Sequence, residues 1–401
     1  MIICPLCRGK RPVCIHNYQL LPKLVGRTLG QEFFGPSYNI FVGKAGYPNV
    51  SIGPMASVEK NIILDDPSKW FGLPYEKIIE TRFLLIRSRQ TAHVKNNSRF
   101  IEDNQLISMS DPIDLELMFK KKPNYNFEFS SITAPMGPTA DIEKLRIAEN
   151  PKISHKLDKI VNDDLNAQEA SVEIYNQGNS IYKLSSILSS GVLGTRKRIV
   201  PSKWCITAID DIIAKDLISS IKEYSSINEY HVYSSEYLDN HFEILLMPGN
   251  WEFENFESWT KKWNAPHSTK VVDKNQDHNL STIVNNKPVI IPESEGFMGR
   301  KKYAFSQSGG YYASRLGVVE ELDSMRKQAR VVCFREIYDG YSVPVGVWLV
   351  RENVRNAMKQ EPKKFATLDE ALIDINTRLR IPIRNYMRKS KIFRQRRLGD
   401  F

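Results

Sequence analysis

The sequence predicts a mixed α/β (α+β) fold, with a small N-terminal zinc module, a two-part α/β body and a flexible basic C-terminal tail. The chain has 401 residues, and its hydrophobic share of 41% and charged share of 25% are typical of globular proteins. Helical and strand-like hydrophobic patterns interleave along the body, and the composition changes at both ends. The expected regions are 1–20 (zinc module), 21–275 and 285–379 (the two parts of the body) and 380–401 (the tail).

The N-terminal part of the body contains residues 33–55, which are rich in Gly and Pro. Short alternating runs interrupt them, and this combination predicts strands joined by tight hairpins. Helical spacing follows over Lys77–Arg87. The charged stretch Asp141–Leu165 and the stretch Ala167–Leu188 predict two further helices.

Strands and a helix are expected again after residue 200. Trp204–Ile209 is predicted to be a strand and Asp210–Tyr224 a helix, followed by alternating strands at His231–Ser235 and Phe242–Met247. An aromatic cluster comes next, and its irregular spacing beside acids favours core packing over the stacking of nucleobases. The cluster consists of Trp251, Phe253, Phe256, Trp259 and Trp263.

The C-terminal part of the body follows a polar stretch, Lys270–Lys287, that is expected to be a linker or a surface loop. Its predicted strands are Pro288–Ile291, Arg330–Glu336 and Val343–Val350, and its predicted helices are Tyr311–Lys327 and Leu368–Arg380. The last helix has its own start signal, because Thr367 occupies the cap position and Glu370 follows three residues later, as in a capping box.

The first sixteen residues contain four side chains of the type that binds zinc, namely Cys4, Cys7, Cys14 and His16. The Cys-x-x-Cys segment turns back through Pro5, which brings two sulfurs to one side. Cys14 and His16 are two residues apart and therefore share one face of an extended strand. Four ligands complete a closed tetrahedral site, so the sequence predicts a structural Zn²⁺ ion rather than a catalytic one.

The other two cysteines, Cys205 and Cys333, lie in apolar surroundings and are expected to be buried, inert thiols. The odd total of five cysteines, three of them close to the N-terminus, argues against a disulfide framework. No apolar run reaches the roughly 18 residues of a membrane span, and the N-terminus lacks the pattern of a secretory signal. We therefore expect a cytoplasmic protein without a membrane partner.

Most of the net charge of +10 belongs to the two ends of the chain. Residues 380–401 contain eight Lys and Arg against one Asp, and residues 1–44 contain six against one Glu. The sequence between them is close to neutral. Two basic ends on a nearly neutral body favour a polyanionic partner, and we expect that partner to be DNA.

The last seven residues carry Gln395, Leu398 and Phe401 in the spacing Gln-x-x-Leu-x-x-Phe. This is the peptide pattern that PCNA, the sliding clamp of DNA replication, binds. Residues three apart eclipse on a 3₁₀ turn, so Leu398 and Phe401 would enter one apolar pocket while the Gln395 amide bonds the clamp backbone. PCNA is therefore the expected protein partner. A second aromatic residue usually follows the first, and its absence here predicts weaker binding.

One segment of the body is a candidate for contact with phosphate or nucleic acid. It has two adjacent glycines with basic residues on either side, so that its backbone amides would surround an anion. Its residues are Arg300, Lys301, Ser308, Gly309, Gly310 and Arg315. The spacing matches neither a Walker nor a dinucleotide motif, and a plain turn is the favoured interpretation. In Phe41–Pro54, the glycines are explained in the same way by tight hairpins.

Two weaker candidates for catalysis lie in the N-terminal part of the body. Asp111, Asp114 and Glu116 would supply carboxylates to a two-metal nuclease centre, although capping and solvent exposure explain them more simply. His93 is a candidate acid or base, although a lone His is more often an ordinary surface or core residue. The catalytic residues are therefore unknown, and the sequence leaves open whether the protein is an enzyme.

Three segments together resemble the archaeal Nre family of DNA repair proteins. They are the N-terminal Cys-x2-Cys-x6-Cys-x-His, the run FVGKAGYPNVSIGP (Phe41–Pro54) and the terminal QRRLGDF. The resemblance extends over the whole chain and includes SQSGGYYASRLG (Ser306–Gly317). It implies two conserved regions, a zinc-type N-terminus, a PCNA-interacting box and a role in DNA damage repair. It implies no catalytic mechanism.

These observations predict a DNA repair factor that PCNA recruits through the C-terminal motif. Two other functions stay open. In one, the body is an enzyme that processes DNA or a nucleotide, which a bound nucleotide or a second metal in the core would indicate. In the other, the protein is a zinc-containing RNA-processing factor whose terminal motif arose by chance.

Overall fold

A computed structural model describes residues 30–395, apart from 58, 60, 125–129, 261–287 and 342–343. Contacts divide the chain into two compact units, Met1–Ile213 and Ala214–Phe401. Helices and strands occur together in both units, which confirms the predicted α+β class. No helix within the described ranges is long and apolar enough to cross a membrane.

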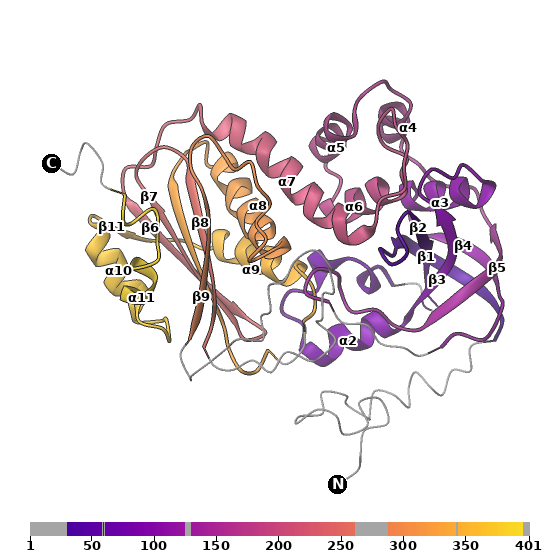
Figure 1. The fold of residues 1–401 in the computed structure, drawn as a ribbon, viewed down its shortest axis with the longest axis horizontal. Coiled ribbons are helices and arrows are strands. Elements are labelled where there is room, and N and C mark those ends of the chain that lie inside the picture. The colour runs from indigo at the N-terminus through magenta and orange to yellow at the C-terminus, as the bar shows by residue number, and fades with distance from the viewer. Residues whose placement is uncertain are drawn as a thin grey trace, which may run out of the picture. The chain divides into compact units, whose positions relative to one another are not determined.

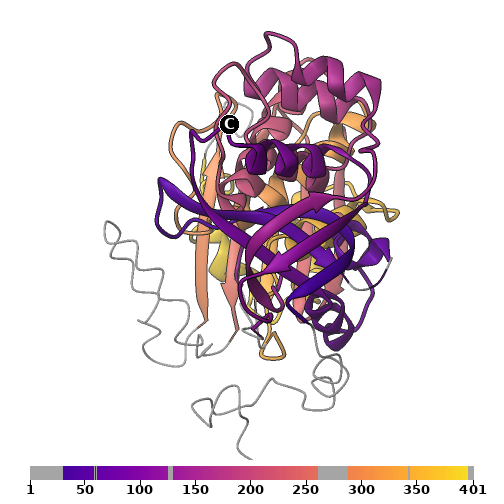
Figure 2. The same cartoon turned by 90° about the vertical axis from the view of Figure 1, so that its right-hand side faces the viewer.

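The first unit is built around a closed barrel of five strands (Figure 2). The strands are β1 (Glu32–Val42), β2 (Asn49–Ser57), β3 (Leu85–His93), β4 (Ile113–Phe119) and β5 (Thr139–Ile147). Their order around the barrel is β1-β2-β3-β5-β4, and neighbouring pairs are antiparallel except for the parallel pair β3 and β5. Helix α3 (Arg99–Met109) connects β3 to β4. This arrangement is the topology of the OB-fold, a five-stranded Greek-key barrel.

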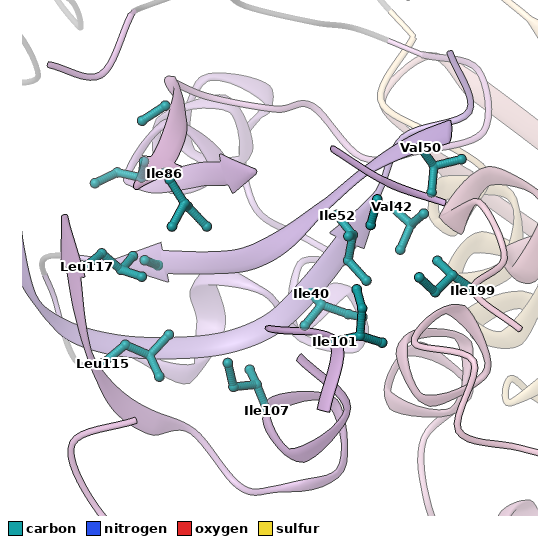
Figure 3. Close-up of a cluster of buried hydrophobic side chains, with 14 of the residues drawn as sticks. Ile40, Val42, Val50, Ile52, Ile86, Ile101, Ile107, Leu115, Leu117 and Ile199 are labelled. Carbon is teal, nitrogen blue, oxygen red and sulfur yellow. The ribbon is translucent and has the colours of Figure 1, made fainter. Parts of the chain in front are cut away.

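Alternating apolar residues fill the barrel (Figure 3). The buried cluster includes Ile40 and Val42 on β1, Val50 and Ile52 on β2, Ile86 on β3, Leu115 and Leu117 on β4, and Ile101 and Ile107 on α3. Spacing of two along each strand puts these side chains on the inner face. The hairpin predicted within residues 33–55 is confirmed, because β1 and β2 pair antiparallel. Gly46 has a φ of 80° in its turn, a conformation that glycine adopts readily.

Helices surround the barrel within the first unit. Two 3₁₀ turns, η1 (Ile62–Leu64) and η2 (Pro67–Lys69), and α2 (Tyr75–Phe83) lie between β2 and β3, while α4 (His155–Val161), α5 (Ala167–Asn176) and α6 (Ile181–Ser189) follow β5. Helices α3 and α6 contact β1. Ser154, Asn166 and Ser180 cap α4, α5 and α6 by accepting backbone N–H groups, which explains where these helices begin.

The second unit contains a mixed sheet of six strands in the order β11-β6-β7-β10-β8-β9. The strands are β6 (Tyr230–Tyr237), β7 (Asn240–Met247), β8 (Glu252–Trp259), β9 (Val289–Glu295), β10 (Arg330–Ile337) and β11 (Lys363–Phe365). Strands β8 and β10 are parallel, and the other pairs are antiparallel. The boundary that the sequence predicts between 275 and 285 lies outside the described residues. The strands on either side of it, β8 and β9, pair with each other in this sheet.

Helices cover both faces of this sheet (Figure 1). Helices α8 (Gly309–Ser324) and α9 (Trp348–Met358) lie on one face, and α10 (Leu368–Asn376) and α11 (Ile383–Met387) lie on the other. Phe256, Phe334 and Tyr386 belong to the buried cluster between the sheet and the second pair of helices. Helix α7 (Ser202–Ile221) begins in the first unit and ends in the second.

Two features that depend on local sequence are confirmed. The capping box at Thr367 and Glu370 is present, with each side chain bonded to the backbone of the other residue. Trp251, Phe253 and Phe256 of the aromatic cluster are fully buried, as the core interpretation requires. Their rings stack on one another and on neighbouring rings rather than facing solvent.

Four predicted elements differ from the structure. Ala167–Leu188 is not one helix but two, α5 and α6, because the chain leaves the helix after Asn176 and Ser180 caps a new one. Trp204–Ile209 is not a strand but part of α7, in which buried Cys205, Ile209 and Ile213 recur every four residues, the spacing of a helix. The stretch Asp141–Leu165 is not one helix, because its first residues pair as β5 and only its later ones form α4. The described part of Val343–Val350 contains the start of α9. An apolar run that is buried on all sides does not distinguish a helix from a strand.

Residues 380–395, which the sequence assigns to a flexible tail, pack against the sheet of the second unit. Ile381, Tyr386 and Ile392 are buried there. The Glu254 carboxylate on β8 accepts hydrogen bonds from the Ser390 hydroxyl and, at 2.8 Å, from the Lys391 backbone N–H. The apolar side chains that alternate with basic ones in residues 380–395 hold this segment on the sheet. The packed part of the chain therefore extends beyond the boundary predicted at 379.

Candidate functional sites

The predicted zinc ligands Cys4, Cys7, Cys14 and His16 lie outside the described residues, so the zinc site stays a prediction. In the described part of the chain, no group of three or more His, Cys, Asp or Glu side chains is placed to hold a metal ion. The acids Asp111, Asp114 and Glu116 are therefore not gathered into a two-metal centre. Glu116 instead pairs with Arg146 at 3.3 Å on the surface.

The thiols of Cys205 and Cys333 are buried, as the sequence predicts. Burial raises the pKa of Cys205 far above its ordinary value and that of Cys333 to about 12. The thiolate is the reactive form of cysteine, so these groups are inert near neutral pH.

The C-terminal motif is described only at its first residue. Gln395 is exposed, and its backbone N–H donates to the Lys391 carbonyl oxygen at 3.1 Å. Leu398 and Phe401 lie outside the described residues. Gln395 therefore follows directly on a part of the chain that Glu254 holds in place, and its own side chain projects from the surface.

The candidate phosphate segment opens helix α8. Ser308 precedes the helix with a φ of 48°, and Gly309 and Gly310 form its first turn, where both are buried. A Cβ atom at Gly310 would lie 3.5 Å from the Glu257 Oε2 atom and 3.6 Å from the Arg335 Nη1 atom. The helix N-terminus therefore faces an existing ion pair.

The arginines of this segment are also paired with acids. Arg300 donates to Glu293 at 2.9 Å, and Arg315 donates to Glu295 at 2.6 Å. The side chains of Arg315 and Glu295 are each only 1% exposed. Lys301, in contrast, is exposed. A phosphate at α8 would compete with carboxylates for both arginines, and phosphate contact in this segment stays a prediction.

A polar network beneath α8 joins three elements of the second unit. The Gln307 amide nitrogen donates to the carbonyl oxygens of Asn255 and Ile291, both at 2.7 Å. Ser314 donates to the Asn255 side chain at 3.1 Å. These bonds tie β8, β9 and α8 together in the interior. No local sequence pattern indicates this network, because its members are widely separated along the chain.

A cavity of about 450 Å³ lies within the first unit, between β1, the loop before η2, the end of α3 and helices α4 and α6. Acids and amides line much of it, together with two basic side chains, the exposed Lys152 and Lys183 of α6. The residues that line it include Asn39, Asp65, Asp66, Asp111, Ser154, Asn179, Tyr182 and Lys183. A cavity with convergent polar groups is the usual form of a small-ligand site.

Two ionisable groups in this cavity, Lys183 and Asp65, have shifted pKa values. Burial lowers the pKa of Lys183 to about 8, against the opposing charges of Asp111 and Asp65. The Lys183 ammonium donates to the Ser110 carbonyl oxygen. Burial raises the pKa of Asp65, while its ion pair with Arg82 lowers it. A lysine that loses its proton near pH 8 beside carboxylates is equipped for proton transfer.

Sequence reasoning identified Asp111 for a different reason and missed Lys183 altogether. The available signal was a lysine inside the apolar helix of residues 181–189. His93, the other candidate acid or base, is exposed, and its Nδ1 atom accepts from the Lys95 backbone N–H at 3.2 Å. It does not line this cavity.

Comparisons with known proteins identify relatives of the whole chain. A family profile described as "Archaeal Nre, N-terminal" matches residues 6–264, and one described as "Archaeal Nre, C-terminal" matches residues 295–401. The chain is 33% identical to the DNA repair protein NreB of Archaeoglobus fulgidus over 412 residues, 99% of each chain. It is 33% identical to the DNA repair protein NreA of the same organism over 413 residues, 99% of this chain and 98% of that one.

A third relative comes from another archaeon. The DNA repair protein NreA of Haloferax volcanii is 32% identical over 371 residues, which are 89% of this chain and 85% of that one. No solved structure matches this chain. Both family profiles and the near-complete coverage agree with the resemblance found in the sequence, and the chain belongs to the archaeal Nre family.

Proposed function

We propose that this chain is a DNA repair protein that the sliding clamp PCNA recruits to DNA through Gln395, Leu398 and Phe401. Its relatives NreA and NreB are named DNA repair proteins, which supports the repair role. The observation that carries the recruitment is the exposure of Gln395 immediately after a packed segment. An exposed Gln395 supports the proposal, because the first residue of the motif is then accessible to a partner.

Apolar packing and hydrogen bonds both hold the residues just before the motif on the second unit. Phe393 packs against the buried cluster of the second unit, and Glu254 bonds to Ser390 and Lys391. Because the motif begins directly after this packed segment, binding to the clamp would keep the body of the protein close to it. Such tethering raises the local concentration at DNA by roughly 10²-fold or more without any new contact to DNA.

Binding to purified PCNA from the same organism tests the proposal. The variant Leu398→Ala, Phe401→Ala removes both apolar anchors, and we expect its affinity, measured by calorimetry, to fall at least about tenfold. Asp400→Ala changes a residue between the two anchors and serves as the matched control, which keeps its affinity. If the double variant binds the clamp as tightly as the unchanged chain, recruitment through this motif is excluded, and the RNA-processing alternative gains weight.

We also propose a structural Zn²⁺ ion bound by Cys4, Cys7, Cys14 and His16. The donor set supports it, because thiolates and imidazole are the preferred ligands of zinc and four of them close the coordination sphere. Mass spectrometry of the native protein should find about one zinc per chain, and Cys4→Ser, Cys7→Ser should lose it. The control Cys205→Ala removes a buried thiol outside the segment and should retain the metal. Unchanged zinc in the first variant would exclude these ligands.

A second function, catalysis on a nucleotide in the cavity of the first unit, is favoured by the position of Lys183. This group loses its proton near pH 8 and lies with Asp65 and Asp111 on the same cavity. Deoxynucleoside monophosphates should then raise the unfolding temperature of the unchanged chain and not that of Lys183→Met. If millimolar nucleotide stabilises neither protein, the cavity has no such substrate.

A further inference from the structure

An exposed aromatic pair lies at one end of the barrel. Tyr47, in the loop between β1 and β2, is 53% exposed, and Trp204, in the first turn of α7, is 45% exposed. Their ring centroids are 5.2 Å apart and their planes are inclined by 56°. Two large rings that meet at the surface leave apolar faces open to a flat partner.

Hydrogen bonds hold three chain segments around this pair. The Val42 backbone N–H donates to the Ser202 hydroxyl oxygen at 2.9 Å, which ties the start of α7 to the end of β1. The Val94 N–H donates to the Pro48 carbonyl oxygen, and the Ile199 N–H donates to the Val94 carbonyl oxygen, both at 3.0 Å. The segments that carry Tyr47 and Trp204 are therefore bonded to the barrel and to each other. The three segments are residues 43–51, 91–98 and 194–205.

These segments contain six basic side chains and no acidic ones. The basic residues are Lys44, Lys95, Arg196, Lys197, Arg198 and Lys203. All of them except the half-buried Lys203 are exposed. Burial lowers the pKa of Lys203, and the positive charge of Lys44 lowers it further. Lys44 and Lys203 therefore repel each other, and an anionic ligand would relieve that repulsion. We call Tyr47, Trp204 and these six residues the barrel-end patch.

The barrel-end patch lies where an OB-fold binds oligonucleotides. In this fold the ligand lies on the face of the second and third strands and against the loops that join strands 1 to 2 and 4 to 5. Tyr47 and Lys44 belong to the first of these loops. The exposed pair Asn49 and His93 continues the patch onto β2 and β3. Exposed residues 120–122, all lysines, open the second loop.

We infer that the barrel-end patch binds single-stranded DNA, with nucleobases stacked on Tyr47 and Trp204 and phosphates beside the six basic side chains. A duplex offers its phosphates but hides the faces of its bases, whereas a single strand offers both. The combination of open rings with basic side chains therefore selects the single strand. The choice of DNA over RNA rests on the proposed repair function.

Fluorescence anisotropy of a labelled 20-residue oligothymidine, titrated with the full chain, tests this inference. The variant Tyr47→Ala, Trp204→Ala should bind about 10- to 100-fold more weakly, because it removes both aromatic faces on which bases would stack. Tyr47→Phe keeps the ring and should keep the affinity. Ile373→Ala is the matched control: Ile373 is 68% exposed, and it lies on α10 of the second unit, outside the patch and the barrel loops.

Three results would overturn the inference. In the first, the double variant unfolds like the unchanged chain and binds oligothymidine equally well. In the second, a duplex of the same length binds as tightly as the single strand. In the third, oligouridine binds at least tenfold more tightly than oligothymidine. PCNA binding is measured on the same double variant and should be unchanged, so that failure at the patch is distinguished from failure of the proposed recruitment.

Discussion

Two basic regions of this chain differ in what surrounds their charges. In the second unit, Arg300 and Arg315 are paired with glutamates at 2.9 and 2.6 Å. In the first unit, the barrel-end patch draws its six basic side chains from segments that contain no acid. The arginines near α8 hold a strand and a helix together, whereas the charges of the patch face solvent. A cluster of basic residues therefore indicates an anion site only when no acids lie beside it.

The largest expected effect comes from breaking a pair in the second unit. Arg315→Met leaves the buried Glu295 carboxylate without its cation, and the free energy of unfolding should fall by about 3–5 kcal/mol. Denaturant unfolding measures this loss. The double variant Arg315→Met, Glu295→Leu removes both charges and should recover much of it. If Arg315→Met is as stable as the unchanged chain, the arginine is not structural and the contrast with the patch disappears.

Glu243 is a second buried glutamate of the second unit that is paired with an arginine, and its contribution to stability should depend on pH. Burial raises the pKa of Glu243, but hydrogen bonds from Arg378, His241 and Ser234 outweigh it and hold the pKa below the ordinary 4.5. The stabilisation is therefore present above pH 4.5 and lost as the pH falls below it. Glu243→Gln should lose about 2–3 kcal/mol at pH 7. Thermal unfolding should show this difference shrinking in acid; a constant difference would mean that charge is not its cause.

Lys183 differs both from the paired arginines of the second unit and from the exposed charges of the patch. It is buried near acids but forms no close ion pair among the described residues. Its pKa of about 8 means that the fold disfavours the charged form, most strongly below pH 8 and not at all above the ordinary 10.5. Lys183→Met should therefore raise stability by about 1–3 kcal/mol at pH 7. The gain should fade between pH 8 and 10.5. A loss of stability at pH 7 would show that the hydrogen bond to Ser110 outweighs burial.

The smallest effect on stability is expected at the barrel-end patch. Lys44→Gln, Lys203→Gln should change the free energy of unfolding by no more than about 0.5 kcal/mol, because neither side chain holds other elements in place. The same variant should reduce the salt dependence of oligothymidine binding, with the slope of log K against log salt smaller by about 1.4. A large loss of stability with an unchanged slope would make these lysines structural and reverse the comparison.

The predictions that succeeded depend on residues close together in the chain. Thr367 and Glu370 are three residues apart and identify a helix start, and the short run Phe242–Met247 is a strand as predicted, although all of its residues are buried. The predictions that failed concern runs whose surroundings decide the outcome. Trp204–Ile209 fits a strand over six residues, and only the continued four-residue spacing to Ile213 shows that it is helical.

The candidate sites divide in the same way. The residues Arg300, Gly309, Gly310 and Arg315 attracted attention because glycines and basic residues are neighbours in the sequence, but Glu293 and Glu295 pair with both arginines in the fold. Tyr47 and Trp204 are 157 positions apart, and their segments drew attention only as a hairpin and family motif (Phe41–Pro54) and as an expected strand (Trp204–Ile209). Sequence inspection could not join them, because β1, β3 and α7 must first assemble.

The sequence by itself determined the family, the mixed fold class, the buried thiols and those helices and strands whose start signals are local. It also supplied the zinc and clamp motifs, which stay predictions. Only the tertiary structure decided that five strands close into a barrel, that residues 380–395 pack on a sheet and which basic side chains have acidic neighbours. The reason is physical: capping and periodicity act over one or two turns of chain, whereas barrel closure and charge pairing depend on residues that meet only after folding.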